Sequence, residues 1–147
     1  RRLAQNGFAR HLRIVERYDP SLPDVECDCD QLIQVFLNLI KNAAEAAPEE
    51  GGQITLRTQF QHGFRMSVGA AGERLELPIA VEVQDNGPGV PADMVHHLFQ
   101  PFVSTKSKGS GLGLSLVAKI VGEHGGLVSY GDGQPGAVFK VRLPAAR

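Results

Sequence analysis

Two apolar stripes at helical spacing constrain the fold more than any other feature of the sequence. The first stripe consists of Leu32, Val35, Phe36, Leu39, Ile40 and Ala43. Asp30 is the expected N-cap of this helix, and Pro48 follows its end. The second stripe lies within residues 114–124, before the helix-stopping pair Gly125 and Gly126. The chain should therefore contain two amphipathic helices, each with one face to bury.

Segments with strand-like alternation surround these helices. The expected strands cover residues 8–18, 53–61, 75–83, 127–130 and 137–143. Residues 62–72 are predicted as a wide hairpin loop, and residues 92–98 suit a short helix. Strands that occur in runs with helices between them favour a mixed sheet covered on one face by helices. The expected fold class is α+β, with the architecture of a two-layer α/β sandwich.

Size and charge limit the function. The chain has 147 residues, of which 42% are apolar, which is enough for one domain with one core. The net charge of -1 provides no broad basic surface for nucleic acid or anionic lipid, so any phosphate must be bound locally. No apolar run approaches the ~18 to 20 residues of a membrane helix, and residues 1–13 lack the apolar centre of a secretory signal. We expect a cytoplasmic domain.

Both cysteines of the chain lie close together, at Cys27 and Cys29. A disulfide across a single intervening residue is strained, and no His/Cys cluster elsewhere in the sequence offers a further pair of zinc ligands. The sequence by itself therefore assigns no metal or redox role to this pair.

The polar face of the first predicted helix carries two asparagines. Asn38 and Asn42 are four residues apart, so they lie on one face with Gln34 and Glu45, opposite the apolar stripe. Amide oxygens suit Mg²⁺ that nucleotide phosphates already hold, because the protein then supplies only one or two ligands. Taken alone, the pattern is more often that of a solvated helix face.

Two glycine-containing segments add further polar features. DNGPGV, residues 85–90, follows a predicted strand; its glycines allow close approach to a flat ligand, and Asp85 can accept a hydrogen bond from an exocyclic amine. GSGLGL, residues 109–114, precedes the second helix, so backbone amides and the helix N-terminus can face phosphate. Taken alone, the first segment is more simply an ordinary turn, and the second is more simply a soluble surface loop. Neither segment has the spacing of a Walker or a dinucleotide-binding motif.

Taken in order, four segments resemble the N, G1, F and G2 boxes of sensor histidine kinases. These segments are NLIKNAAEA, DNGPGV, LFQPFVSTK and GSGLGLSLV, and the resemblance spans about residues 8–144. It implies the Bergerat ATP-binding fold of the GHKL family, with ATP between the helices and a flexible lid at about residues 103–111. It also implies histidine protein kinase activity, with ATP and Mg²⁺ as cofactors.

Because the four segments match the family's boxes, the resemblance implies roles for individual residues. Asn42 would ligate Mg²⁺ with Asn38 close by, and Asp85 would accept a hydrogen bond from the adenine amine. Gly87 and Gly89 would shape the adenine pocket. These five residues are therefore the expected nucleotide and metal site outside the lid.

The other expected site residues belong to the lid and to the helix after it. Phe99 and Phe102 would hold the lid in place, and Lys106 would contact phosphate, which makes it an expected catalytic residue beside Asn38 and Asn42. The remaining expected nucleotide contacts are Thr105, Gly109, Gly111, Leu112, Gly113 and Leu114. The glycines would bend the lid and expose backbone amides to the triphosphate, and the leucines would pack beneath.

RYDPSLPDV, DQLIQVFLNLIKNAAEA and VQDNGPGVP further resemble the sensor kinases of nitrogen regulation. This resemblance implies three partners: the phosphoacceptor histidine domain of the same kinase, a response regulator of the NtrC type and a PII signal protein. It implies neither nucleic acid nor direct membrane contact. Residues 1–7 would end the linker from a missing dimerisation and phosphoacceptor domain, and residues 8–147 would form the catalytic ATP-binding domain.

Asn38 favours transfer over hydrolysis. Gyrase-like and Hsp90-like ATPases carry a glutamate at the matching position, where the carboxylate activates water as a base. An amide cannot take up that proton, so Asn38 favours holding ATP intact for an external histidine. Two alternatives share the fold: a nucleotide-binding regulatory module that transfers nothing, and an anti-sigma-type serine kinase. Asn42, Asp85 and the lid glycines argue against the first, and the linker-like residues 1–8 argue against the second.

Overall fold

The computed structural model describes residues 12–61, 63, 65–68, 73–100, 113–133 and 136–146. The expected linker over residues 1–7 and the expected lid over residues 103–111 lie outside this part of the chain. So do the predicted site residues Phe102, Thr105, Lys106, Gly109, Gly111 and Leu112. Within the described ranges, no helix is both long and apolar enough to cross a membrane.

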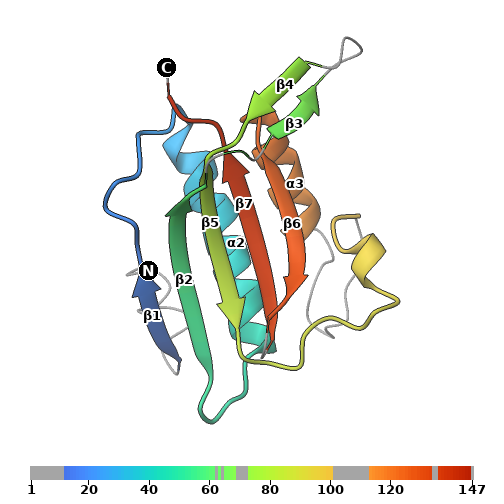
Figure 1. Cartoon of the computed structure of the whole chain (residues 1–147). Coiled ribbons are helices and arrows are strands. Elements are labelled where there is room, and N and C mark those ends of the chain that lie inside the picture. The colour runs from blue at the N-terminus through green and yellow to red at the C-terminus, as the bar shows by residue number, and fades with distance from the viewer. Residues whose placement is uncertain are drawn as a thin grey trace.

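A five-stranded mixed sheet forms one layer of the molecule (Figure 1). Its strands, in spatial order, are β1 (Arg13–Arg17), β2 (Gln53–Phe60), β5 (Ile79–Asp85), β7 (Ala137–Leu143) and β6 (Leu127–Asp132). β1 pairs parallel with β2, and the other neighbours pair antiparallel. Because β5 and β7 run in opposite directions, the turn after β5 lies next to the turn before β7.

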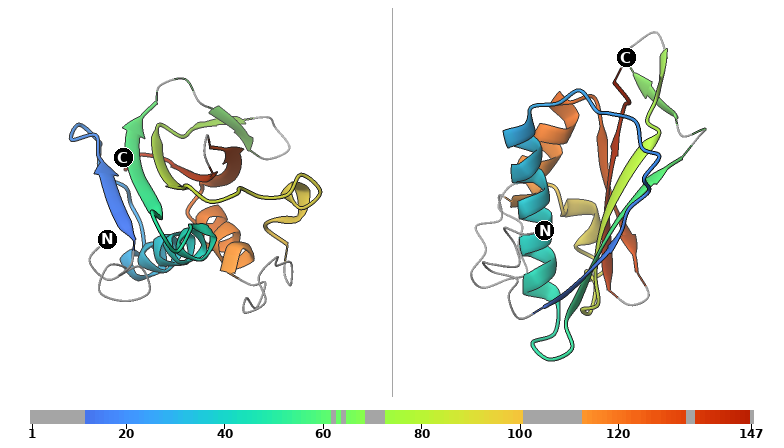
Figure 2. Two further views of the ribbon diagram at one scale, coloured as in Figure 1. Left: turned by 90° about the horizontal axis from the view of Figure 1, so that it is seen from below. Right: turned by 90° about the vertical axis from the view of Figure 1, so that its left-hand side faces the viewer.

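Two helices form the second layer and cover one face of the sheet (Figure 2). α2 (Cys29–Ala46) and α3 (Gly113–Glu123) pack against each other and against the strands. Side chains alternate between the two faces of β7, so Phe139 and Val141 face the helices. The helical spacing of α2 places Val35 and Leu39 against the sheet. Each such side chain contributes roughly 1.5–3 kcal/mol when fully buried. The predicted two-layer α/β sandwich is confirmed.

A separate hairpin replaces part of the predicted loop. β3 (Arg65–Val68) and β4 (Glu73–Glu76) pair antiparallel in a two-stranded sheet of their own. The prediction of a loop over residues 62–72 and of one strand over residues 75–83 was therefore wrong. The strand breaks at Leu77 and Pro78, because proline has no amide to donate to a neighbouring strand. Pro78 instead accepts a hydrogen bond from the amide of Gln61 at 2.7 Å.

The N-cap of α2 is Asp28, and the prediction of Asp30 was wrong. The side chain of Asp28 accepts a hydrogen bond from the amide of Gln31 at 3.1 Å, which is the usual contact of an N-cap. Residues 92–98 contain turns around the 3₁₀ helix η1 (Val95–His97) instead of a regular short helix. The strand predicted over residues 127–130 extends to Asp132.

A buried carboxylate lies on the face of the sheet opposite the helices. Glu82 of β5 is 6% exposed and forms salt bridges with Arg57 of β2 at 2.8 Å and with Lys140 of β7 at 3.0 Å. Burial raises the pKa of Glu82, but the hydrogen bonds and charges of Lys140 and Arg57 outweigh it and place the pKa below its ordinary value of 4.5. Glu82 therefore joins the three central strands through charge as well as through the backbone.

Glu82→Gln should reduce the acid sensitivity of the fold. A carboxyl whose pKa is lower in the folded state stabilises the fold above its unfolded pKa, and this stabilisation is lost as the pH falls through the folded pKa. The variant should be less stable than the parent at pH 7, and the gap should close below about pH 4. Urea unfolding at both pH values measures this, with Glu50→Gln in an exposed loop as the control. A constant gap across the two pH values would contradict the assignment.

Candidate nucleotide site

The polar face of α2 meets the first residue of α3. Gln34 donates a hydrogen bond from Nε2 to Oδ1 of Asn38 at 2.8 Å, and Nδ2 of Asn38 donates to the carbonyl oxygen of Gly113 at 3.5 Å. Gln34 and Asn38 therefore share one face of the helix, as their spacing predicts. Asn42, one turn further along α2, is half-buried. The structure thus brings the predicted site residues Asn38 and Gly113 into contact.

β5 ends at Asp85, which is 2% exposed. Its Oδ1 accepts hydrogen bonds from the amide of Gly87 at 2.8 Å and from the amide of Ala137 at 3.4 Å. Its Oδ2 is a buried atom to which no described residue donates a hydrogen bond. Two backbone amides therefore fix the carboxylate, and Oδ2 can accept a hydrogen bond from a bound molecule.

Glycines allow the backbone to close around Asp85. A Cβ added at Gly87 would overlap the carbonyl group of Ala46, at the end of α2. Gly136 has a φ of +89°, and a Cβ added there would overlap the carbonyl group of Asp85. Both positions therefore require glycine. The turn after β5, the end of α2 and the start of β7 meet at this carboxylate.

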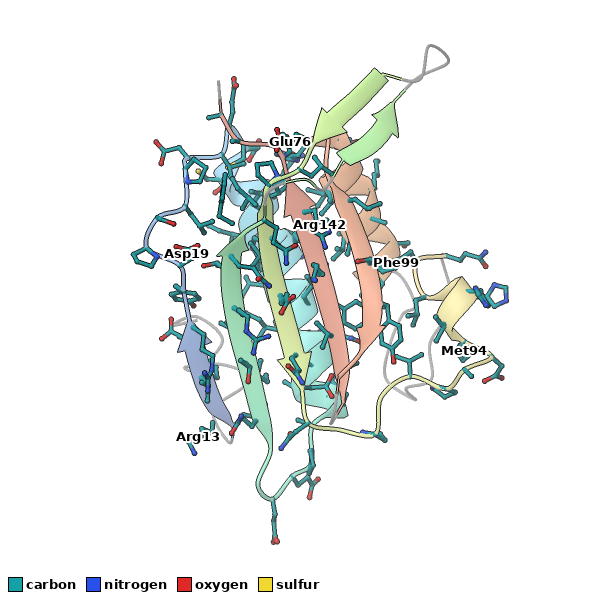
Figure 3. All side chains as sticks on the ribbon, in the orientation of Figure 1. Arg13, Asp19, Glu76, Met94, Phe99 and Arg142 are labelled. Carbon is teal, nitrogen blue, oxygen red and sulfur yellow. The ribbon has the colours of Figure 1, made fainter. Side chains whose placement is uncertain are left out.

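Aromatic rings lie beside the turn after β5. The hydroxyl of Tyr130 accepts a hydrogen bond from the amide of Val90 at 3.2 Å, and the Tyr130 ring lies 5.6 Å from that of Phe139. Phe99, which is labelled in Figure 3, follows η1. It packs edge-on against Phe139, with the ring centroids 6.2 Å apart. Tyr130 therefore holds the Val90 end of the segment between the turn and Gln100 against the sheet, and Phe139 holds the Phe99 end. The role of Phe99 in holding a lid stays a prediction.

Tyr130, Gly136 and Ala137 also lie at the site, although the sequence did not predict them. They reach the turn after β5 because β7 pairs antiparallel with β5 and β6 pairs with β7. Alternation places Tyr130 and Ala137 in strands but does not say which strands are neighbours. The glycine-rich segment GDGQPG before Ala137 was the local signal that a tight backbone approach occurs there.

Of the residues that follow the predicted lid, the structure describes those from Gly113 onward. Gly113 is the exposed first residue of α3, and Leu114 packs half-buried against the core. The first amides of a helix have no partner within the helix, so the start of α3 can face an anion. The roles predicted for Phe102, Thr105, Lys106, Gly109, Gly111 and Leu112 concern residues outside the described ranges.

The side chains near the start of α3 fit a magnesium ion that is bound mainly by phosphate. In the part of the chain that the structure describes, no three His, Cys, Asp or Glu side chains gather as a metal site. The oxygen donors on this face of α2 include the neutral amide oxygens of Asn38 and Asn42. Such hard oxygen donors suit Mg²⁺ when a nucleotide supplies the negative charge and water completes the coordination.

The chain matches one protein family and several curated relatives. The model described as "Histidine kinase-, DNA gyrase B-, and HSP90-like ATPase" matches residues 27–147. The sensory histidine kinase/phosphatase NtrB of Azospirillum brasilense is 61% identical over 98% of this chain and 36% of its own length. The same-named protein of Rhizobium leguminosarum bv. phaseoli is 54% identical over 100% of this chain and 39% of its own length. The chain thus spans well under half the length of these curated relatives.

Solved structures agree with the fold described above. The catalytic domain of the histidine kinase ThkA, in a nucleotide-free form, aligns with a TM-score of 0.76 and 29% identity, over 99% of this chain and 88% of that domain. Full-length ShkA in complex with AMPPNP aligns with a TM-score of 0.76 and 29% identity, over 99% of this chain and 28% of that protein. The predicted Bergerat-type fold is therefore confirmed by its structural relatives.

Proposed function

Because the chain belongs to the family of histidine kinase-, DNA gyrase B- and HSP90-like ATPases, we propose that it binds Mg·ATP as the catalytic domain of an NtrB-type sensor histidine kinase. The γ-phosphate would go to a histidine in a separate helical domain. The contact of Asn38 with Gly113, the first residue of α3, is the main support for this proposal. It joins α2, which carries Asn38 and Asn42, to the helix that begins at the end of the glycine-rich segment 109–114. The 61% identity to an NtrB protein supports the narrower assignment.

Adenine recognition is proposed for the region around Asp85. The carboxylate is oriented by the amides of Gly87 and Ala137, and its Oδ2 would accept a hydrogen bond from the exocyclic amine. Gly87 and Gly89 would let the backbone of the turn lie close to the flat base. A hydrogen bond that a buried carboxylate accepts from an amine is charge-assisted and therefore among the stronger ones, so it suits discrimination between bases.

Magnesium and phosphate binding are proposed for the start of α3 and the facing side of α2. Asn42 would ligate Mg²⁺, with Asn38 close by, and the ion would neutralise charge on the phosphates. Phe99 and Phe102 would hold the lid, and Lys106 would contact phosphate. The other proposed lid and helix contacts are Thr105, Gly109, Gly111, Leu112, Gly113 and Leu114. These residues would position the phosphates instead of reacting with them.

Asn38 favours transfer because its amide cannot act as a base toward water. The Nδ2 and Oδ1 atoms of Asn38 are engaged by Gly113 and Gln34, so the side chain positions α3 relative to α2. A neutral imidazole from another domain is already nucleophilic and needs no base from this chain. We therefore expect slow hydrolysis of ATP by this domain alone.

The remaining assignments concern the whole kinase and its setting. Residues 1–7 would end a linker from the dimerisation domain, and residues 8–147 would form the catalytic domain. The partners would be the phosphoacceptor histidine of the same kinase, an NtrC-like response regulator and a PII signal protein. The domain would work in the cytoplasm, where ATP and these partners are available.

A transfer experiment tests the proposed activity. The chain would be extended by the helical segment that precedes the matching region in the NtrB relatives and incubated with ATP labelled on its γ-phosphate. We expect acid-labile label on the added helices, because phosphohistidine hydrolyses in acid. Acid-stable label on serine would favour a serine kinase, and absence of transfer despite nucleotide binding would favour a regulatory module.

Asp85→Asn should weaken ATP binding by about ten- to a hundredfold, since a charged hydrogen bond contributes about 1.5–3 kcal/mol. Binding of GTP should change little, because guanine presents an oxygen where adenine presents the amine. Calorimetry with both nucleotides measures the difference, and Asp93→Asn in an exposed turn is the matched control. Equal losses for the two nucleotides would exclude the amine contact.

A further inference from the structure

Two free thiols flank the residue that caps α2. Cys29 is exposed, Cys27 is half-buried, and Asp28 lies between them with φ −81° and ψ 109°. In an extended backbone, the residues on either side of a given position project their side chains to the same side. The conformation of Asp28 therefore places the side chains of Cys27 and Cys29 on the same side of the backbone, two positions apart in the chain.

The surroundings of Cys27 make its thiol less acidic than an ordinary cysteine. Burial, the charge of a Cys29 thiolate and a hydrogen bond with Cys29 all raise the pKa of the Cys27 thiol, and the charge of Asp28 adds to this effect. Cys27 is therefore the weaker nucleophile toward a reagent in solution. Exposed Cys29 is the thiol that such a reagent meets first.

Asp28 also holds the two helices together, which fixes the geometry of the thiols. Its side chain caps α2 through the amide of Gln31, and its own amide donates a hydrogen bond to Nε2 of His124 at 3.1 Å. His124 follows α3 and donates from Nδ1 to the carbonyl oxygen of Ile120 at 2.8 Å. Bonds on both sides of Asp28 therefore keep it extended and keep the thiols adjacent.

We propose that Cys27 and Cys29 form a dithiol modification site, which low-molecular-weight disulfides such as oxidised glutathione convert to an intramolecular disulfide. The thiolate of Cys29 attacks one sulfur of the reagent, forming a mixed disulfide and releasing one glutathione thiolate. Cys27 then attacks the Cys29 sulfur, which forms the Cys27–Cys29 bond and releases the second glutathione thiolate. The two protons lost by the cysteines go to the two glutathione molecules, and the reagent takes up both electrons.

The small ring makes this modification reversible. Closing a disulfide across one residue stores strain, and strained disulfides have more oxidising potentials and are reduced more easily than structural ones. The second step is intramolecular between adjacent groups, so proximity offsets the weaker nucleophilicity of Cys27. The site therefore follows the thiol–disulfide balance of its surroundings.

Intact mass measurement after incubation with oxidised glutathione tests the site. The wild-type chain should lose two hydrogens and carry no glutathione, and excess dithiothreitol should restore the original mass. Cys27→Ser should keep one glutathione on Cys29, because it lacks the thiol that resolves the mixed disulfide. Cys29→Ser should be modified roughly tenfold more slowly, because its remaining thiol is half-buried with a raised pKa.

Other outcomes would overturn the proposal. A wild-type chain that keeps a glutathione adduct, forms covalent dimers through Cys29, or stays unmodified would show that the two thiols do not form a ring. The experiment needs no nucleotide, so its result is independent of the proposed kinase function. Circular dichroism of both serine variants would verify that each is folded.

Discussion

Asn42→Ala should abolish magnesium-dependent phosphotransfer while the domain stays folded. The side chain is half-buried on the polar face of α2, so its removal should leave the apolar packing of the helix intact. Loss of a metal ligand should reduce transfer at least about a hundredfold, since even the groups that support metal ligands contribute ten- to a hundredfold. Transfer from labelled ATP to the added helical domain, followed as a function of magnesium concentration, measures the effect.

Lys41→Ala is the matched control for this variant. Lys41 is the preceding residue on α2 and is exposed, and surface substitutions of this kind change stability by no more than about 0.5 kcal/mol. Its transfer rate and magnesium dependence should match those of the parent. Transfer by Asn42→Ala at the parental rate would refute the metal role of Asn42, and an equal loss in Lys41→Ala would show that the effect is not specific.

Gly136→Ala should cause the largest loss of stability of any alanine substitution discussed for this chain. A side chain at a φ of +89° is strained, and its Cβ would overlap the carbonyl group of Asp85. The strain costs roughly 1–2 kcal/mol and the forced shift about 1–3 kcal/mol more. The free energy of unfolding should therefore fall by about 3 kcal/mol, as measured by urea unfolding. Adenine nucleotide affinity should fall as well, because the Asp85 carboxylate would move.

Gly122→Ala provides the opposite expectation with the same chemical change. Gly122 lies within α3 and its φ is not in the left-handed region, and an added Cβ would meet nothing within 4 Å. Alanine should stabilise the helix by up to about 1 kcal/mol. If both variants were equally stable, the close approach of the β6–β7 turn to Asp85 would not be the reason that position 136 needs glycine.

The helices and most strands could be predicted because their residues repeat with clear periods. The α2 stripe places Val35 and Leu39 on the buried face, and the alternation of β7 does the same for Phe139 and Val141. The N-cap of α2 could not be predicted in this way, because Asp28 and Asp30 both precede the apolar stripe. The backbone conformation of Asp28 identifies it as the N-cap. A period identifies the element and its buried face but not its first residue.

The hairpin of β3 and β4 could not be predicted from pattern. Its strands are four residues each and form a sheet outside the main one, so the core imposes no strict alternation on them. The break at Pro78 was visible in the sequence as a proline within a strand-like run. The apolar residues on both sides of Pro78 continue the alternation, so the periodicity alone does not reveal the break.

Several contacts of the candidate site join segments that are distant in the sequence. Asp85 and Gly87 were found because they lie within one turn, and Asn38 because it lies four residues from Asn42. The contacts of Asp85 with Ala137, and of Val90 with Tyr130, depend on strand order. The contact of Asn38 with Gly113 depends on how α2 packs against α3. Sequence spacing carries no information about either arrangement, so these contacts required the fold.

Calorimetric titration of the purified chain with a non-hydrolysable ATP analogue tests the central claim most directly. With magnesium present, we expect binding at a single site per chain, and removal of magnesium should weaken it by about tenfold or more, which is at least 1.4 kcal/mol. Asp85→Asn should lose the preference for adenine in the same assay. Absence of binding, or binding that is indifferent to magnesium, would contradict the proposal that α2, the Asp85 turn and the start of α3 form one Mg·ATP site.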